Sequence, residues 1–315
     1  MTDELLARVR ATGLLPAGAD VLVLLSGGRD SVCLLDVALA LDCAVRALHV
    51  NYGLRAEADA DEAHCRELCA RLDVDLVVHE ASRPDDATGN LQAWARDVRY
   101  GAAAEVAGAG LIAVAHTASD QAETILYRLA SSPGRRALLG MAPRSGRLVR
   151  PLLGVTREET GAWCRAHGLA WRDDVTNASD EYARGRVRHG LLPALEAVDP
   201  RAAANVVRTA QLLRDEAEVL DVVVDTALAG RDRIALEHLA ALPLALARLV
   251  VRRLAERATG ALCARAAARL DDIVGLGEAG ALDVGDGARA VVQSGVLRFE
   301  RTPPLPARPV DESAI

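Results

Sequence analysis

Six consecutive residues near the N-terminus have the types and spacing that can hold a phosphate group: Ser26, Gly27, Gly28, Arg29, Asp30 and Ser31. They follow the apolar run Val21–Leu25 and precede a helix-like segment that begins at Val32. A strand, a two-glycine turn and a helix place free backbone N–H groups and the positive end of a helix dipole at one point. The loop is therefore predicted to bind a phosphate or pyrophosphate.

Asp30 indicates which kind of phosphate site this is. The loop lacks the Lys of a Walker A motif, and a carboxylate beside a polyphosphate repels it unless a cation lies between them. Mg²⁺ is the natural bridge, with Asp30 as its ligand. The alternative for the two glycines alone is an ordinary turn in which Ser31 caps the helix. The complete string resembles the pyrophosphate-binding loop of the PP-loop ATPases, which implies ATP cleavage between the α- and β-phosphates.

A second cluster of polar residues follows the apolar run Leu111–Ala115. His116 comes directly after it, and Asp120 and Glu123 lie within the first turn of the next helix-like segment. An imidazole and two carboxylates would then gather near the phosphate loop. For this cluster taken alone, capping of the helix by its hydroxyl residues, with acidic residues favoured by the dipole, is the simpler interpretation.

Arginines form two further candidate groups. Arg96, Arg99 and Tyr100 share one helix face at i, i+3 and i+4 spacing. Arg184 and Arg188 lie four residues apart in a polar stretch and can face one substrate. The first set could reach phosphate or substrate, and the alternative for both sets is ordinary solvated or ion-paired surface arginine.

The segments around these clusters alternate between strand-like and helix-like patterns. We expect strands at 21–25, 44–50, 76–78 and 111–115 and helices from 32 and at 59–72, 90–106, 119–129 and 157–168. This alternation predicts an α/β fold with a parallel, doubly wound sheet of the PP-loop ATPase, adenine nucleotide alpha hydrolase-like type. Ligands of such sheets bind at the carboxyl ends of the strands, where the loop and His116 fall.

The α/β pattern stops near Asp199-Pro200. Long helical periodicity follows over 202–228, 234–258 and 264–276, and short alternating segments with hairpin-turn residues fill 281–300. The chain has 315 residues, more than the roughly 250 to 300 that one core usually holds. Two domains are predicted: 1–205, the PP-loop catalytic domain, and 206–315, a mainly helical docking domain with a small β end.

Composition indicates an ordinary globular chain. It is 51% apolar and 26% charged, no apolar run is long enough to span a bilayer, and the first residues lack the basic region of a signal peptide. We therefore expect no membrane contact and a cytoplasmic location. The six cysteines include no CxxC spacing, which disfavours a disulfide framework or a metal cluster.

Basic charge is unevenly distributed along the chain. The net charge is −7, and all 37 Lys and Arg residues are Arg. Between Thr124 and Arg157 there is no Asp or Glu, but there are seven arginines: Arg128, Arg135, Arg136, Arg144, Arg147, Arg150 and Arg157. The acidic total argues against indiscriminate nucleic-acid binding, but this stretch leaves two interpretations open, local RNA binding and solvated loop arginine.

Several short strings carry a narrower resemblance. In chain order they are Asn51-Tyr52-Gly53-Leu54-Arg55, Ala95-Arg96-x-x-Arg99-Tyr100, Ala115–Thr124, Gly140-Met141, Arg150-Pro151-Leu152-Leu153, Trp171–Asn177, Tyr182–Arg188 and Leu191-Leu192-Pro193. Together they resemble the tRNA(Ile)-lysidine synthetases, a PP-loop family, over roughly the first two thirds of the chain. The conjunction is far more specific than any single string.

Five positions depart from the pattern of that family. Tyr52 stands where His is usual, Gln92 where Glu is common, Thr117 where a second His often occurs, Ser119 where the first of two Asp is expected, and Gly185 where Asn is frequent. The missing carboxylate at Ser119 leaves more of the metal or substrate positioning to Asp120.

The resemblance implies an ATP-dependent ligase that joins free L-lysine to C2 of the wobble cytidine in the CAU anticodon of tRNA(Ile). The reaction would pass through an adenylated cytidine and release PPi and AMP. The loop 26–31 would bind ATP, and Asp30 would also bind Mg²⁺. Catalytic roles would fall to Asp30, Arg96, His116, Asp120, Glu123 and Arg184. Residues 206–315 would dock the tRNA; a homodimer is one option for the assembly, and a family member of this length is expected to lack the additional terminal domain of longer relatives.

Two other functions stay open at this point. A tRNA sulfur transferase built on the same loop would need an activated Cys or cluster ligands, and the absence of CxxC weighs against it. A non-catalytic nucleotide- or RNA-binding module would fit the departures at Ser119 and Tyr52. Turnover of ATP distinguishes that module from an enzyme.

Overall fold

The computed structural model describes the chain except for residues 1, 54–56, 84–89, 133, 173–182 and 304–315. The chain divides into two units, Met1–Arg214 and Asp215–Ile315. Both this division and the predicted boundary after residue 205 fall within helix α10 (Ala202–Leu228). Much of the predicted polar stretch that precedes Arg184 lies outside the described residues.

The first unit contains a six-stranded sheet with the strand order β3-β2-β1-β4-β6-β5. The strands are β1 (Asp20–Leu24), β2 (Ala44–Asn51), β3 (Asp75–Glu80), β4 (Leu111–Ala113), β5 (Arg144–Ser145) and β6 (Leu148–Val149). β3, β2, β1, β4 and β6 run parallel, and β5 pairs antiparallel with β6. The predicted parallel α/β sheet is confirmed. The pattern missed β5 and β6 because strands of two residues leave no periodicity.

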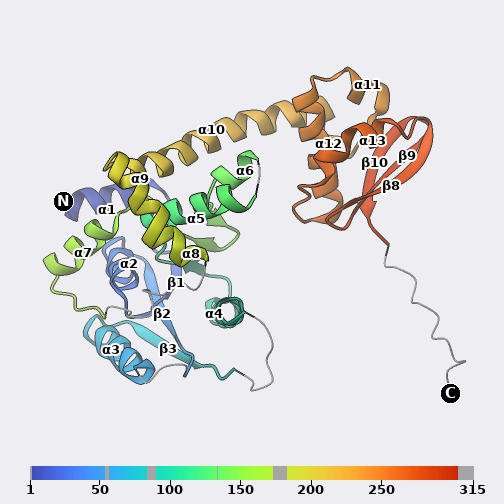
Figure 1. Ribbon diagram of the computed structural model, residues 1–315. Helices are drawn as coiled ribbons and strands as arrows, with labels where there is room; N and C mark the ends of the chain where they lie inside the picture. Colours follow the sequence, from blue (N-terminus) through green and yellow to red (C-terminus); the bar gives the residue numbers. More distant parts are fainter. Residues whose placement is uncertain (1, 54–56, 84–89, 133, 173–182, 304–315) are drawn as a thin grey trace, which may run out of the picture. The chain divides into compact units, whose positions relative to one another are not determined.

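Helices cover both faces of this sheet, because successive side chains of β1 point to opposite sides. Val21 and Val23 join one buried core and Leu22 and Leu24 another. The first core includes residues of α1 (Thr2–Ala11), α2 (Arg29–Ala40), α3 (Ala58–Arg71) and α7 (Arg157–Ala166), and the second those of α4 (Leu91–Ala107). Figure 1 shows α4 across the strands from α2 and α3.

A further group of helices packs on α5 (Ala118–Ser131). Ala122 and Leu126 of α5 share a buried cluster with Val187, Leu192 and Val207. The helices around it are α6 (Arg135–Leu138), α8 (Ala183–Arg186), the π-helix η2 (Val187–Leu191), α9 (Leu192–Val198) and the start of α10. This packing brings the predicted Arg184 and Arg188 to the surface of α5.

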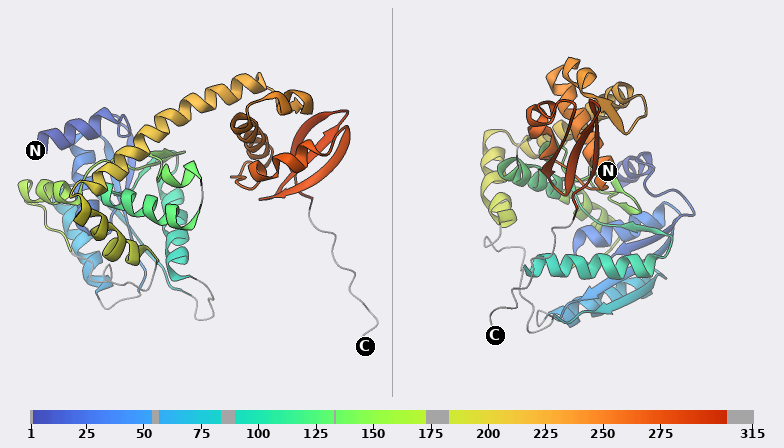
Figure 2. Two further views of the ribbon diagram at one scale, coloured as in Figure 1. Left: turned by 45° about the horizontal axis from the view of Figure 1, so that its top comes forward. Right: turned by 90° about the vertical axis from the view of Figure 1, so that its right-hand side faces the viewer.

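The second unit packs helices on an antiparallel sheet of strand order β7-β10-β9-β8, as the left view of Figure 2 shows. Its elements are β7 (Arg233–Ala235), α11 (Leu236–Ala241), α12 (Leu244–Thr259), the 3-10 helix η3 (Ala266–Arg269), α13 (Leu270–Val274), β8 (Ala279–Gly285), β9 (Ala288–Gln293) and β10 (Val296–Arg301). Positive φ angles at Asp286-Gly287 and Ser294-Gly295 confirm the predicted hairpin turns.

One long helix predicted in this unit is wrong. The expected helix over 234–258 begins instead with the strand β7, and α11 ends at Ala241 before α12 starts at Leu244. Pro243 lies at the break, where it lacks an N–H and restricts the residue before it. Within the part of the chain that the structure describes, no helix is both long and apolar enough to cross a membrane.

Gly140 offers a test of the packing beside α5. Its φ is +61°, and a Cβ there would lie 2.6 Å from Oε1 of the buried Gln121. Since both the backbone and the contact would be strained, we expect Gly140→Ala to lower the free energy of unfolding by about 2 kcal/mol or more. Urea unfolding followed by tryptophan fluorescence measures the loss, because all three tryptophans lie in the first unit.

Gly146→Ala is the matched control. Gly146 also has a positive φ, +59°, but a Cβ there would meet nothing within 4 Å. This substitution should cost only about 1 kcal/mol, for the backbone alone. Equal losses in the two variants would contradict the proposed contact with Gln121.

Candidate functional site

The loop 26–31 leaves the carboxyl end of β1 and runs directly into α2. Gly27 has a φ of +81°, and Gly28 is the residue before the first turn of α2. Ser31 Oγ donates to the carbonyl of Gly28 at 2.8 Å and accepts from the N–H of Ser26 at 3.2 Å. Ser31 therefore ties the loop to itself and does not cap the helix. The first N–H groups of α2 have no acceptor within the helix, as a phosphate site requires.

The loop is supported from behind by β2 and α3. The carbonyl of Leu25 accepts a hydrogen bond from Nδ1 of the buried His49 at 2.9 Å. A Cβ on Gly27 would lie 3.2 Å from Sγ of Cys65, so a larger residue there requires that side chain to shift by a few tenths of an ångström. Burial raises the pKa of Cys65 to about 12, which keeps it an inert thiol. Residue pattern does not predict these two supports, because His49 and Cys65 come from separate elements.

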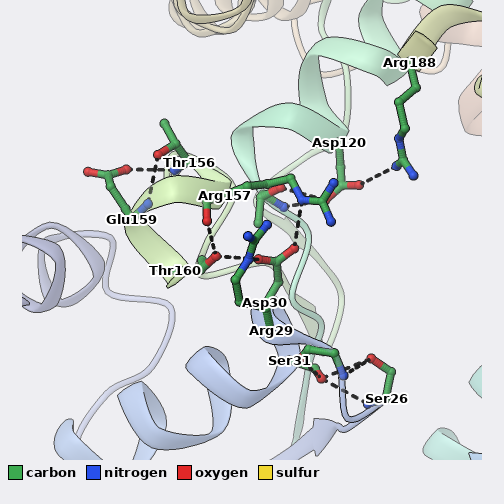
Figure 3. Close-up of polar contacts among 12 residues, drawn as sticks. Ser26, Arg29, Asp30, Ser31, Asp120, Thr156, Arg157, Glu159, Thr160 and Arg188 are labelled. Carbon is green, nitrogen blue, oxygen red and sulfur yellow. Dashed lines mark hydrogen bonds and ion pairs between the residues drawn. The ribbon is translucent and has the colours of Figure 1, made fainter. Parts of the chain in front are cut away.

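Asp30 lies in the first turn of α2 and faces the start of α7, as Figure 3 shows. Thr160 Oγ1 donates to Asp30 Oδ1 at 2.5 Å. Nε of Arg29 lies 3.4 Å from the same oxygen, and Nε of Arg157 lies 3.7 Å from Oδ2. A capping box fixes where α7 begins. The carboxylate is thus held between two guanidinium groups and one hydroxyl.

His116 follows β4 and is an uncharged imidazole at neutral pH. Its Nδ1 lies 3.2 Å from Nε of Arg150, which donates to it, so the ring proton belongs on Nε2. Burial is the main cause that lowers the pKa of His116 to about 4. The charge of Asp120 opposes this shift, while Arg150, Arg99 and Arg184 add to it.

The two carboxylates after His116 have different surroundings. Asp120 Oδ2 accepts from the N–H of Thr117 at 2.8 Å and from its hydroxyl at 2.9 Å, and Oδ1 lies 3.7 Å from Nη2 of Arg188. Glu123 is 5% exposed and accepts two hydrogen bonds from Arg188, at 2.6 and 3.0 Å. Thr117 is the N-cap of α5 and forms a capping box with Asp120, so the interpretation of capping by a hydroxyl residue is confirmed, whereas Glu123 is paired with Arg188.

Arginines gather around His116 from four parts of the first unit. We call this set the arginine group: Arg96, Arg99, Arg128, Arg150 and Arg184. Arg150, 7% exposed, donates to the carbonyl of Ala142 at 2.7 Å. Burial lowers its pKa, and Arg96 and Arg128 lower it further while Tyr100 opposes them.

Among the described residues, two further members of this group donate hydrogen bonds to uncharged acceptors. Arg128 donates to the carbonyl of Gly140 at 2.6 Å, and Arg184 donates to the hydroxyl of Thr124 at 3.0 Å. Burial, followed by the charge of Arg184, lowers the pKa of Arg128. Carbonyl and hydroxyl oxygens orient a guanidinium without neutralising it, so the group is suited to bind an anion.

A cavity of about 420 Å³ opens at the carboxyl ends of β2 and β3. Its lining includes Asn51, Asp59, Glu62 and Glu80. Asn51 Nδ2 donates to Glu62 Oε2 at 3.0 Å, and this bond, followed by that from Arg66, lowers the pKa of Glu62. This part of the sheet edge is acidic, in contrast to the arginine group. Asp59 and Glu62 come from α3, and Glu80 is the last residue of β3.

Comparison with known proteins places this chain in a family. The model of the PP-loop domain matches residues 5–195. The tRNA(Ile)-lysidine synthase of Symbiobacterium thermophilum is 37% identical over 336 residues, which cover 96% of this chain and 70% of that protein. The chain belongs to the tRNA(Ile)-lysidine synthase family. The relative from Xanthomonas campestris pv. campestris (strain 8004) is 40% identical over 223 residues, covering 67% of this chain and 51% of that protein.

The chain spans about half the length of several lysidine synthase relatives that it matches, including the one from Xanthomonas. Among solved structures, the U34-tRNA thiolase NcsA from Methanococcus maripaludis is similar, with a TM-score of 0.57 and 18% identity over 67% of this chain and 78% of that chain. At this identity the similarity extends to the fold alone.

In this lysidine synthase family member, the predicted site residues form two neighbouring groups. Asp30 and the loop 26–31 make one, and His116, Asp120 and Glu123 lie with the arginine group in the other. Arg188 connects the two groups, because it forms an ion pair with Glu123. Its pKa is raised mainly by the hydrogen bond to Glu123 and also by the charge of Asp30. Arg157 and Thr160 on Asp30, and Arg150 on His116, are the contacts that sequence analysis missed, although both arginines belong to its basic stretch.

The low pKa of His116 predicts a pH dependence of stability. An unfolded chain binds a proton on this residue below about pH 6.5, whereas the folded chain does so only below about pH 4, so protonation favours unfolding between these values. We expect wild type to lose about 1 to 3 kcal/mol more than His116→Asn as the pH falls through this window. Asn keeps an acceptor for Arg150. Urea unfolding by tryptophan fluorescence tests this; parallel pH profiles would contradict it.

Proposed function

We propose that the chain ligates free L-lysine to the wobble cytidine of a CAU-anticodon tRNA(Ile), with ATP converted to AMP and PPi. One observation carries the proposal: a phosphate loop containing Asp30 adjoins a second, uncompensated positive site around the neutral His116. ATP cleaved between its α- and β-phosphates needs both sites, one for the leaving pyrophosphate and one for the adenylate. Membership of the lysidine synthase family supports the same substrates.

The loop 26–31 and the first turn of α2 would bind the β- and γ-phosphates through backbone N–H groups. The residues present fit a Mg²⁺ ion held mainly by phosphate oxygens, because among the described residues Asp30 Oδ2 makes only the 3.7 Å ion pair with Arg157, and one carboxylate suffices for such an ion. Mg²⁺ bound there would reduce the negative charge on the leaving pyrophosphate. Arg29 and Arg157 supply further positive charge at the same point.

In the first step the C2 oxygen of the cytosine attacks the α-phosphate, and PPi leaves. Charge develops on the α-phosphate oxygens, and guanidinium groups already fixed by carbonyl acceptors can stabilise it without rearranging. Arg96 and Arg184 are the exposed members of the arginine group and are placed to contact the nucleotide. The product is a cytidine adenylated on its C2 oxygen.

In the second step the ε-amine of lysine attacks C2, and AMP leaves with that oxygen. The attacking amine must lose protons to reach the neutral product, so a carboxylate has to hold the ammonium and accept a proton. Asp120 suits this role, because within the described part of the chain its Oδ1 makes only the 3.7 Å contact with Arg188. Glu123, bound twice by Arg188, positions that arginine.

The alternative functions have less support. The curated relatives reported above are named as lysidine synthases, which favours the ligase over a sulfur transferase. All six cysteines are buried, and the described residues include no group of three or more His, Cys, Asp or Glu that could hold a metal ion. A binding module without catalysis would not require Asp30, His116 and Asp120 to adjoin the anion loop.

The decisive assay is mass analysis of a CAU-anticodon tRNA(Ile) transcript after incubation with the chain, ATP, Mg²⁺ and lysine. We expect an ATP-dependent gain of one lysine at the wobble cytidine. Asp30→Ala and Arg96→Ala should each lower the rate by about 100-fold or more, since each removes a charge that acts on the phosphates. Arg10→Ala, on the exposed face of α1, is the control and should react normally. Full activity of both site variants would overturn the assignment.

The two carboxylates of α5 should affect different steps. We expect Asp120→Asn to leave adenylation largely intact and slow the lysine step by about 100-fold or more, because the amide keeps the cap but cannot take a proton. Glu123→Gln should slow both steps, since it releases Arg188. Rapid-quench measurement of adenylated RNA and lysidine separates the steps. Equal slowing of both steps in Asp120→Asn would contradict its role.

A further inference from the structure

Aromatic residues are scarce in this chain and concentrate beside the arginine group. The chain has one Phe, four Tyr and three Trp, and Tyr52, Trp94 and Tyr100 lie together. The rings of Tyr52 and Trp94 meet edge to face with centroids 5.8 Å apart. Burial raises the pKa of the Tyr52 phenol, and the charges of Arg99 and Tyr100 also affect it, so Tyr100 lies near this ring pair.

Two guanidinium groups complete this cluster. Cζ of Arg96 lies 4.8 Å from the centroid of the Tyr100 ring, and Cζ of Arg99 lies 5.4 Å from it. These residues share one face of α4 because they are spaced by three and four positions. All three rings are only half-buried, so they keep surface for a partner. Flat cationic and aromatic groups therefore stand side by side.

Two polar atoms in the cluster point to a missing partner. Tyr100 Oη and Arg99 Nε are buried, and neither has a hydrogen-bond partner among the residues that the structure describes. Buried polar atoms are nearly always satisfied, because leaving them unpaired is costly. The polar groups of the cluster are therefore not all satisfied within the described part of the chain.

We propose that Tyr52, Trp94 and Tyr100, with Arg96 and Arg99, form a stacking site for an unpaired RNA base adjacent to the nucleotide that reacts. This inference rests on the proposed function. Loop bases of RNA are commonly recognised by stacking on aromatic rings and on Arg guanidinium planes, and their edges carry donors and acceptors. A phosphate alone would leave three rings without a role.

The cluster also lies where a neighbouring base would fall. The charge of Arg99 adds to the lowering of the pKa of His116 by burial, and the charge of Arg96 adds to the lowering of the pKa of Arg150. The cluster therefore lies near the site where the wobble cytidine would be adenylated. The hydroxyl of Tyr52 donates to the carbonyl of Ala95 at 3.0 Å. That bond fixes the turn after β2 against α4, so Tyr52 has both a structural contact and a ring surface.

A double-mutant cycle with abasic RNA tests the proposal. The affinity of the full chain for a fluorescein-labelled anticodon stem-loop is measured by anisotropy without ATP, for RNA that is intact or abasic on either side of the wobble cytidine. For wild type, one abasic position should weaken binding roughly 5- to 100-fold. Trp94→Leu should weaken binding of intact RNA by a similar factor. The affinity of this variant should then fall little further when the same base is removed, because the stacking contact is already lost.

Two variants serve as controls. Tyr52→Phe keeps the ring and removes the bond to Ala95, so it should bind RNA like wild type. Tyr127→Leu changes an exposed tyrosine, 38% accessible, outside the cluster and should also bind normally. Equal loss in Tyr127→Leu and Trp94→Leu would mean that any exposed ring matters, which would overturn the proposal.

The outcomes separate this inference from the proposed function. If wild type forms lysidine but Trp94→Leu binds intact RNA normally, the stacking site is wrong and the ligase remains. If wild type forms no lysidine but shows the predicted coupling between Trp94 and one abasic position, the stacking site stands and the ligase is wrong. Additive losses from Trp94→Leu and the abasic position would contradict stacking.

Discussion

Charge compensation at Asp30 is the constraint on which the first unit depends. A carboxylate in a phosphate-binding loop would repel the phosphate. Thr160 and Arg157 of α7 lie against the Asp30 carboxylate and reduce this repulsion. The same two helices meet again where Asp36 of α2 accepts a 2.7 Å hydrogen bond from Trp163 of α7. α7 is thereby fixed to the helix that carries the phosphate loop, and the loop is held in place before any ligand arrives.

The arginine group follows a different physical rule. An acidic protein of net charge −7 concentrates positive charge at one place by satisfying guanidinium donors with carbonyl oxygens, as Arg128 and Arg150 show. Each side chain is oriented while its charge stays uncompensated. His116, kept neutral by burial, adds a polar group there without adding to the mutual repulsion. The oriented guanidinium groups therefore produce a positive electrostatic potential around His116, and a bound anion would partly neutralise it.

How far the sequence predicts this structure depends on the range of the contacts. The phosphate loop, the four main parallel strands and the cap of α5 at Thr117 are local, and residue pattern alone predicted them. The bond from Thr160 to Asp30 joins residues 130 positions apart, and that from Arg188 to Glu123 spans 65. No periodicity encodes such pairs, because they depend on how whole helices pack. The false helix over 234–258 shows the reverse, a pattern that Pro243 overrode.

The restriction of the basic residues to arginine has a chemical consequence at this site. Guanidinium groups stay protonated at any physiological pH and are poor nucleophiles, whereas an ε-amino group near an activated cytidine would compete with the free amino acid. With all 37 basic residues arginine, the chain has no side chain with a primary amine to place beside such an intermediate. Under the proposed reaction, the guanidinium groups that attract the nucleotide do not compete with lysine as the attacking amine. The protein is thereby protected from becoming its own substrate.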